Sequence, residues 1–245
     1  MKMKRLKIIS TLFILLPVLM ASSSYGKTTD TVPDKAVLEK FEQVCKKMND
    51  VKGNYTLGGV INIIDRANPA DAMDHVNFLF CKQADEFYYR LGKTITLNEQ
   101  GVYLYIDNQS RRVMVSPQKK VEYDAGIKQF AYMGANIQSE HYKMTSKING
   151  DEQTISLVNE RHISCKQYTI TFDRQSLKVK YLYMRLTNLN DPLNKANEKI
   201  VTVSISKWDN TAAISQYLSK DKVIKNVKGG WRTVNEYRSY ELIKM

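Results

Sequence analysis

Segments in which apolar and polar residues alternate on both sides of a turn constrain the fold of this chain most strongly. The turn sequences Asn108-Gln109, Asn149-Gly150 and Arg174-Gln175 each lie between two such segments. If each turn is a two-residue loop, apolar side chains meet across the hairpin that it closes. One-sided strands of this kind belong to an antiparallel sheet with one buried face and one solvated face.

The three hairpins predict definite cross-strand partners. These partners are Val102 with Val115 and Leu104 with Val113, Tyr142 with Leu157 and Met144 with Ile155, and Tyr168 with Tyr181, Ile170 with Val179 and Phe172 with Leu177. Residues 87–91 and 201–206 alternate in the same way and extend the sheet. The chain therefore contains a long meandering sheet.

Helical spacing is found in three shorter segments. Val37, Phe41, Val44 and Met48 predict an amphipathic helix over 34–49. Two further short helices are expected over 124–136 and from Asn210, the second presenting Ile214, Tyr217 and Leu218 on one side. Helices this few exclude a regular βαβ alternation, so the expected class is α+β, with a few helices packed on one face of a curved antiparallel sheet.

The first 26 residues have the pattern of an export signal. Four basic residues precede the apolar run from Ile8 to Ala21, and small residues follow it up to Gly26. We expect cleavage near Gly26, a single domain over residues 27–245 with no transmembrane segment, and a periplasmic location. The formal net charge then falls from +12 to +8, because residues 1–26 contain four lysines or arginines and no acidic residue. The remaining basic residues are scattered, which argues against a nucleic-acid partner.

Three cysteines follow the export signal. Cys81 and Cys165 lie in strand-like segments and could form a disulfide in an oxidising compartment, whereas Cys45 lies on the expected helix. The alternative is that all three are small buried apolar residues.

The residues that usually carry chemistry do not form a recognisable site. His75, His141 and His162 lack metal-ligand spacing, and only His162 has a nearby thiol, that of Cys165. Positions three apart in a strand point to opposite faces, so this pair is not expected to act as nucleophile and base. The sequence predicts no enzyme, no metal site and no cofactor.

The apolar side of the sheet leaves two functions open. Helices either fill its concavity and make an ordinary core, or leave a cavity for an apolar ligand. The residues expected to line such a cavity are Phe87, Leu91, Val102, Leu104, Val113, Val115, Ile170, Phe172 and Val179.

The order of these elements resembles that of the LolA-like family, which comprises periplasmic lipoprotein carriers and their relatives. The resemblance is most specific at Leu97–Asp107 and Arg112–Val115, where a polar turn with Gly101 leads into an aromatic-rich strand and a return strand of alternating valines. The basic residue that these carriers use to hold their lid closed has no clear equivalent, because Arg66 follows the strand in which it would be needed.

The resemblance implies an open half-barrel of antiparallel strands wrapped around a few helices, with an apolar cavity that holds acyl chains. It implies a non-enzymatic exported carrier whose partner is a lipid or an acylated protein. The alternative is a module with a filled core that binds another envelope protein.

Overall fold

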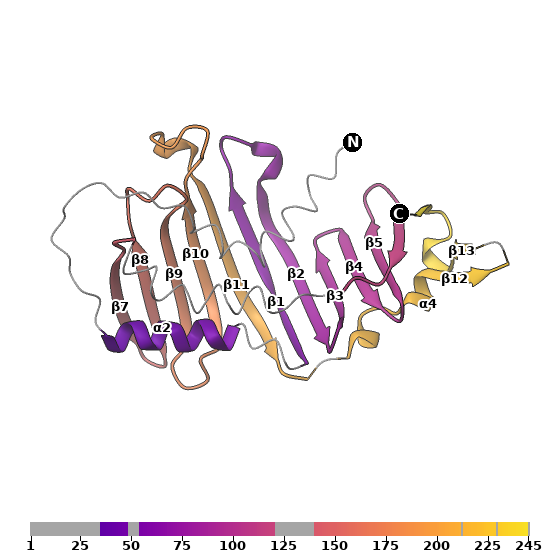
Figure 1. The fold of residues 1–245 in the computed structure, drawn as a ribbon, viewed down its shortest axis with the longest axis horizontal. Coiled ribbons are helices and arrows are strands. Elements are labelled where there is room, and N and C mark those ends of the chain that lie inside the picture. Colours follow the sequence, from indigo (N-terminus) through magenta and orange to yellow (C-terminus); the bar gives the residue numbers. More distant parts are fainter. Residues whose placement is uncertain (1–34, 49–53, 121–139, 212, 229, 245) are drawn as a thin grey trace. The chain divides into compact units, whose positions relative to one another are not determined.

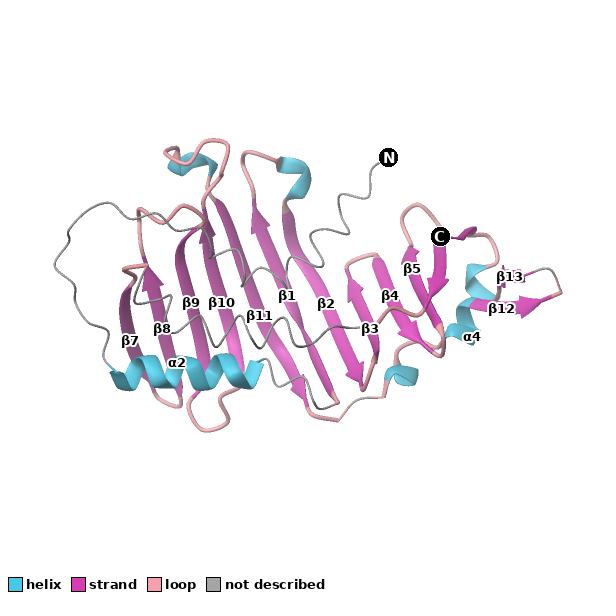
Figure 2. Cartoon of the chain, viewed as in Figure 1, coloured by secondary structure: helices cyan, strands magenta, loops and turns pink. Residues whose placement is uncertain are grey.

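Strands make up most of the residues that the computed structural model describes, which are 35–48, 54–120, 140–211, 213–228 and 230–244 (Figures 1 and 2). Twelve strands are hydrogen-bonded in the order β14-β6-β5-β4-β3-β2-β1-β11-β10-β9-β8-β7, and the ends of this sheet do not close on each other. A separate two-stranded sheet pairs β12 (Ile224–Val227) with β13 (Gly230–Thr233).

The remaining twelve strands form the large sheet, and their bounds are given in chain order. They are β1 (Tyr55–Ile64), β2 (Met73–Gln83), β3 (Glu86–Leu91), β4 (Thr94–Glu99), β5 (Val102–Asp107), β6 (Arg112–Pro117), β7 (Lys143–Asn149), β8 (Glu152–Val158), β9 (Cys165–Asp173), β10 (Val179–Leu186), β11 (Lys199–Asp209) and β14 (Glu241–Lys244). The chain divides into two compact units, which are described separately below. Unit 1 comprises residues 1–50, 62–74 and 123–204, and unit 2 comprises residues 51–61, 75–122 and 205–245.

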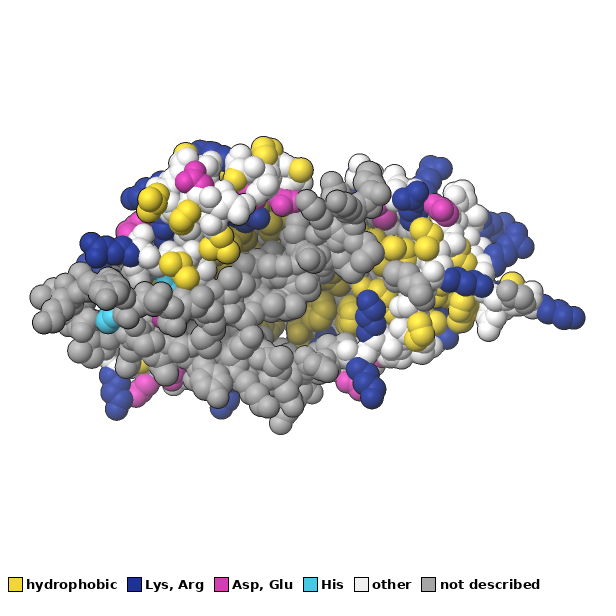
Figure 3. Space-filling model, turned by 45° about the horizontal axis from the view of Figure 1, so that its top comes forward, with side chains coloured by type: hydrophobic (Ala, Val, Ile, Leu, Met, Phe, Trp, Pro, Cys, Tyr) yellow, Lys and Arg dark blue, Asp and Glu magenta, His cyan; other side chains and the backbone are white. Residues whose placement is uncertain are grey.

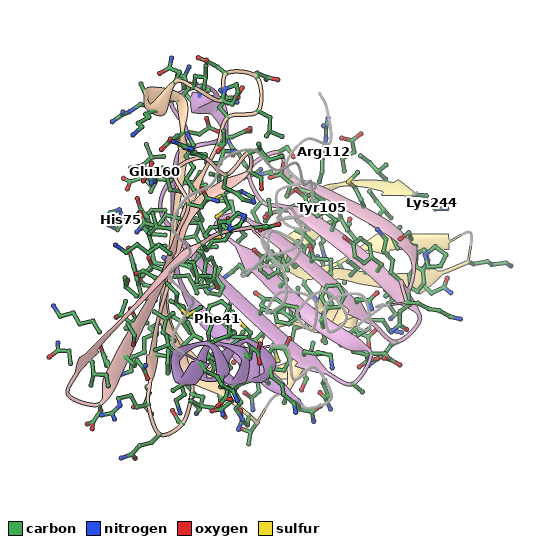
Figure 4. The ribbon with its side chains drawn as sticks, turned by 60° about the vertical axis from the view of Figure 1, so that its left-hand side comes forward. Phe41, His75, Tyr105, Arg112, Glu160 and Lys244 are labelled. Atoms are coloured by element: carbon green, nitrogen blue, oxygen red, sulfur yellow. The ribbon has the colours of Figure 1, made fainter. Side chains whose placement is uncertain are left out.

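The core of unit 1 includes one face of the helix α2 (Lys35–Met48), which confirms the amphipathic helix expected over 34–49. Leu38, Phe41, Val44 and Cys45 are buried on this face. The Phe41 ring lies edge-on to the ring of Tyr168 on β9, with 6.1 Å between centroids, and Figure 4 shows Phe41 projecting from the helix towards the strands. Spacing of three and four residues places these side chains on one side of a helix, so α2 covers unit 1 with a single apolar stripe.

The core of unit 2 lies between strands β2–β6 and the C-terminal segment. Leu97, Leu104, Ile106, Val113 and Val115 contribute buried side chains from the strands. The C-terminal segment contributes Ile214, Leu218, Val223, Ile224 and Tyr237. The chain then returns to the sheet, because β14 adds to β6 in parallel and Arg112 forms an ion pair of 2.8 Å with Glu241.

The expected fold class, an α+β half-barrel wrapped around a few helices, is wrong in its helices. The described residues contain two α-helices, α2 and the four-residue α4 (Lys220–Val223), beside several 3-10 turns. Ile214 and Leu218 are buried as predicted. The segment that carries them forms a 3-10 turn over Ile214–Gln216 rather than the expected α-helix. So short an apolar pattern does not determine a helix, because nucleation is costly and tertiary contacts decide the conformation. The helix expected over 124–136 lies outside the described residues. The sheet is also not purely antiparallel, since β14 pairs in parallel.

The register of two predicted hairpins differs from the expected one by two residues. Leu104 lies opposite Val115, and Val113 lies opposite Ile106, because the loop after Asp107 has four residues rather than two. In the second hairpin Met144 lies opposite Leu157. A change of two residues keeps every side chain on its expected face.

The cross-strand pairs of the third hairpin differ more strongly from the predicted ones. Phe172 lies opposite Val179, but a bulge at Lys180 then changes the pairing, so that Ile170 lies opposite Leu182. One extra residue in a strand inverts the alternation beyond it. Tyr168 therefore lies opposite Met184 instead of Tyr181.

Candidate functional site

Seven of the nine residues that were expected to line a cavity lie in the packed cores. Val102, Leu104, Val113 and Val115 belong to the core of unit 2, where the C-terminal segment packs on them. Ile170, Phe172 and Val179 are buried in unit 1. Their burial fits the predicted apolar face, and binding of a ligand by them stays a prediction.

The strand register places the remaining two, Phe87 and Leu91, on the other face of unit 2. Tyr88 pairs with Leu97, Leu97 with Leu104 and Leu104 with Val115, so these side chains share the core face. Phe87 and Leu91 lie at odd positions of β3, whereas Tyr88 lies at an even one. Successive side chains of a strand point to opposite faces, so Phe87 and Leu91 point away from this core.

Three aromatic side chains surround Phe80 on this other face, and we call the four together the aromatic cluster: Tyr55, Phe80, Phe87 and Tyr89. The Phe80 ring centroid lies 5.6 Å from that of Tyr55, 6.1 Å from that of Phe87 and 6.2 Å from that of Tyr89. Tyr55, Phe80 and Phe87 remain partly exposed, while Tyr89 is buried. Figure 3 shows hydrophobic side chains at the surface of the described part of the chain.

The surroundings of the aromatic cluster are mainly apolar at one end and charged at the other. Phe78 pairs with Leu91 beside the cluster, and both side chains are buried. At the other end Lys82 pairs with Phe87. Burial lowers the pKa of the Lys82 ammonium, and the nearby carboxylate of Asp85 acts against this shift. The arrangement offers aromatic surface to an apolar molecule and supplies no nucleophile.

A buried polar group lies around His162 in unit 1, and the sequence analysis did not connect its members Glu140, Tyr142 and Ser164 with this histidine. His162 is buried, and its Nε2 lies 3.2 Å from a carboxylate oxygen of Glu140. Its Nδ1 accepts the backbone N–H of Cys165 at 3.0 Å and that of Ser164 at 3.2 Å. The Tyr142 hydroxyl donates to the carbonyl oxygen of Cys165. Burial lowers the pKa of His162 and raises the pKa of Glu140.

This group has the residue types of a catalytic triad but not the geometry of one. The Ser164 hydroxyl lies 3.3 Å from His162 Nδ1, which is within reach of a base. However, the single lone pair of that nitrogen already accepts two backbone N–H groups, so it is not free to remove a proton. The arrangement fixes the turn that precedes β9, and it offers no activated nucleophile.

The cysteines follow the second alternative from the sequence. Cys45, Cys81 and Cys165 are all buried and none of them forms a disulfide, so the pair of Cys81 and Cys165 is not formed. Burial raises the pKa of the Cys165 thiol to about 12, which keeps it protonated and unreactive. Across the described ranges no cluster of three or more His, Cys, Asp or Glu side chains could hold a metal ion. Neither of the described helices is long and apolar enough for a membrane span.

Ion pairs connect three loops of unit 1, which follow β1, β8 and β10. Lys166 and Glu198 form a pair of 2.8 Å in which both side chains are only 6% exposed. Lys199 binds Asp65 at 2.7 Å, and Arg185 contacts both Glu160 and Glu198. Four aliphatic side chains project from these loops and from the adjoining end of β1, and we call them the apolar rim: Ile64, Ile163, Leu189 and Leu193. They are four of the six large hydrophobic side chains that are exposed in the described part of the chain.

Comparison with known proteins identifies structural neighbours only. No family model matches the sequence, and no curated protein matches it. A LolA superfamily protein from Nitrosomonas europaea is similar in fold, with a TM-score of 0.30 and 8% identity over 74% of this chain and 97% of that chain. A member of the LolA superfamily is thus among the structural neighbours.

Two further solved structures are similar. An uncharacterized conserved protein from Thermus thermophilus gives a TM-score of 0.39 and 7% identity over 86% of this chain and 100% of that chain. A DUF1329 family protein from Desulfovibrio piger gives a TM-score of 0.28 and 9% identity over 78% of this chain and 99% of that chain. Identities and TM-scores this low assign no function, so the function is argued from the site.

Proposed function

We propose that this protein is an exported, non-enzymatic binding protein that carries a lipid, or the acyl chain of a lipoprotein, against the aromatic cluster of unit 2. The observation that carries this proposal is the set of four neighbouring rings on the sheet face opposite the core of that unit. The export signal expected over residues 1–26 and the resemblance of the central hairpin to the LolA-like family support it.

The interaction would be driven by removing apolar surface from water. Each buried methylene contributes about 0.8 kcal/mol, so a chain of ~14 carbons gains roughly 10 kcal/mol before the costs of ordering it. Aromatic rings suit such a ligand, because they present large apolar areas and lose little rotamer freedom. No polar chemistry is required of the protein.

Lipid extraction and a probe titration test the proposal together. Lipids from the natively purified protein are identified by mass spectrometry, and binding of a fluorescent fatty acid is titrated. Phe87→Ala should weaken probe binding about tenfold, because it removes one ring from the cluster. Val227→Ala, at an exposed apolar position of the same unit, is the matched control and should bind like the unaltered protein. Absence of both a co-purified lipid and saturable probe binding would contradict the proposal.

The apolar rim favours a second candidate, a module with filled cores that binds another envelope protein. Apolar side chains gathered at one place on a surface are typical of protein interfaces. In this case Leu189→Ser and Leu193→Ser abolish crosslinking to a partner in the cell envelope, while Phe87→Ala leaves it unchanged. Crosslinking of the two leucine variants at the level of the unaltered protein would contradict this candidate.

A further inference from the structure

Strand β7 forms one edge of the 12-stranded sheet (Figure 1). Among the residues that the structure describes, it pairs with β8 alone. Six of its seven side chains are exposed, and the seventh, that of Met144, is partly exposed. An edge of this length presents a row of backbone N–H and C=O groups to which another strand can bind.

The two faces of β7 differ in character. Lys143, Thr145 and Lys147 lie on one face. Met144, Ser146 and Ile148 lie on the other, next to the buried Leu157 and Ile155 of β8. Ile148 is 55% exposed, so it presents apolar surface at this edge of the sheet.

A second copy of the same strand matches this pattern in one antiparallel register. With Ser146 opposite its own equivalent, Met144 lies opposite Ile148 of the other copy, and Thr145 lies opposite Lys147. Apolar side chains then meet on one face, and no lysine directly faces a lysine. Each copy makes the same contacts, as a two-fold interface requires.

The neighbouring registers are excluded by charge. A slip of two residues in one direction places Lys147 opposite Lys147, and a slip in the other direction places Lys147 opposite Lys143. Like charges that lie directly opposite each other destabilise a strand pair. Lysines on an edge strand usually discourage pairing. Here they discriminate between registers and leave one of them free of repulsion.

We propose that β7 is the interface of a homodimer, in which two copies pair their β7 strands antiparallel about a two-fold axis at Ser146. Seven residues a side bury less surface than a standard stable interface, so the dimer is weak and depends on concentration. This inference concerns unit 1 and does not depend on ligand binding by unit 2.

Single cysteines test the register directly. Ser146→Cys places two thiols opposite each other across the axis, so mild oxidation should give a disulfide-linked dimer. Thr145→Cys and Lys147→Cys should each crosslink poorly alone and well when the two variants are mixed. The native cysteines are buried, so the unaltered protein serves as the background. Crosslinking of Ser146→Cys no better than that background, or no better than Lys147→Cys alone, overturns the register.

Sedimentation equilibrium tests the dimer without crosslinking. Ile148→Lys places a charge opposite Met144 and should weaken dimerisation at least about tenfold. Thr145→Glu faces Lys147 twice in the dimer and should strengthen it about fivefold. Val227→Lys, an exposed position in unit 2, is the control and should have no effect. A circular dichroism spectrum confirms that each variant is folded. A protein that stays monomeric at the highest concentration reached overturns the proposal.

Discussion

His162 is held at both ring nitrogens, and this fixes its protonation state. Because Nδ1 accepts two backbone N–H groups, it carries no proton, and Nε2 carries the proton that faces Glu140. A second proton on Nδ1 would break both hydrogen bonds and charge a buried ring. Burial accordingly lowers the pKa of His162.

This geometry predicts that acid destabilises unit 1. The unfolded chain binds a proton on His162 near pH 6.5, before the folded chain does, so the free energy of unfolding decreases as the pH falls below that value. His162→Asn should remove this loss, because an asparagine oxygen can accept the same backbone N–H groups without titrating. Thermal unfolding of both proteins between pH 5 and about 8 checks the prediction.

Glu140 provides the control for this titration. Burial raises its pKa, so the folded chain binds this proton before the unfolded chain, and its contribution to stability has the opposite sign. Glu140→Gln should therefore steepen the loss of stability below pH 6.5. An identical pH dependence in the unaltered protein and His162→Asn would show that the histidine is not the responsible group.

Helix α2 and the loop between β10 and β11 each stabilise unit 1 by a different kind of contact. Helix α2 contributes apolar burial from one stripe of side chains. The loop is held by the buried pair of Lys166 and Glu198, in which Lys166 also donates to the carbonyl oxygen of Pro192. Burial of charges is costly, so such a pair persists only when both partners are present.

Removing one partner of this pair should be strongly destabilising. Glu198→Leu leaves the Lys166 ammonium buried without its carboxylate and should cost about 3 kcal/mol of unfolding free energy. The double variant Lys166→Met and Glu198→Leu should recover most of this loss, because the ammonium is removed together with its carboxylate and Arg185 keeps its contact with Glu160. Urea unfolding of the two single variants and the double variant measures the coupling. Additive losses would contradict a direct interaction.

Substitutions at a buried and at an exposed position of α2 should change the stability of the protein by very different amounts. Phe41→Ala removes a fully buried ring that contacts Tyr168 and should cost about 3 kcal/mol. Glu39→Ala removes an exposed ion pair with Lys35, 3.8 Å long, and should change stability by less than about 0.5 kcal/mol. Chemical denaturation of both variants measures the two losses of unfolding free energy. Equal effects would mean that α2 does not pack on unit 1.

The two proposed activities lie in different compact units, which predicts that they can be separated. The aromatic cluster belongs to unit 2, and strand β7 belongs to unit 1. Ile148→Lys should therefore weaken dimerisation and leave the affinity for an acyl probe within about twofold of its original value. Phe87→Ala should weaken probe binding and leave dimerisation unchanged. A variant that loses both activities while remaining folded would show that they are linked.

Alternation in the sequence predicted the buried face of most strands, but it did not predict their partners, and it failed beyond the bulge in β10. Leu104 and Val113 lie on the expected face, although their partners differ by two residues from those predicted. Burial repeats every second residue, so a change of two in the register leaves the pattern intact. The bulge at Lys180 left no signal in the pattern, because its position follows from pairing with the neighbouring strand.

The candidate site could be predicted only in part, and for a related reason. Phe87 was identified, but it was grouped with Leu104, which lies on the opposite face of the same unit. Of the group around His162, the sequence pointed only to the nearby Cys165, because Glu140 lies more than twenty positions away and no local spacing connects it to the histidine.

Residue order alone predicted the three hairpins, the amphipathic helix and most of the apolar faces, because these follow from side-chain periods within one segment. The partner of each strand, the loss of the expected helix after Asn210 and the return of β14 to β6 depended on contacts between segments far apart in the chain. A local pattern does not encode such contacts, since many distant segments offer the same apolar surface.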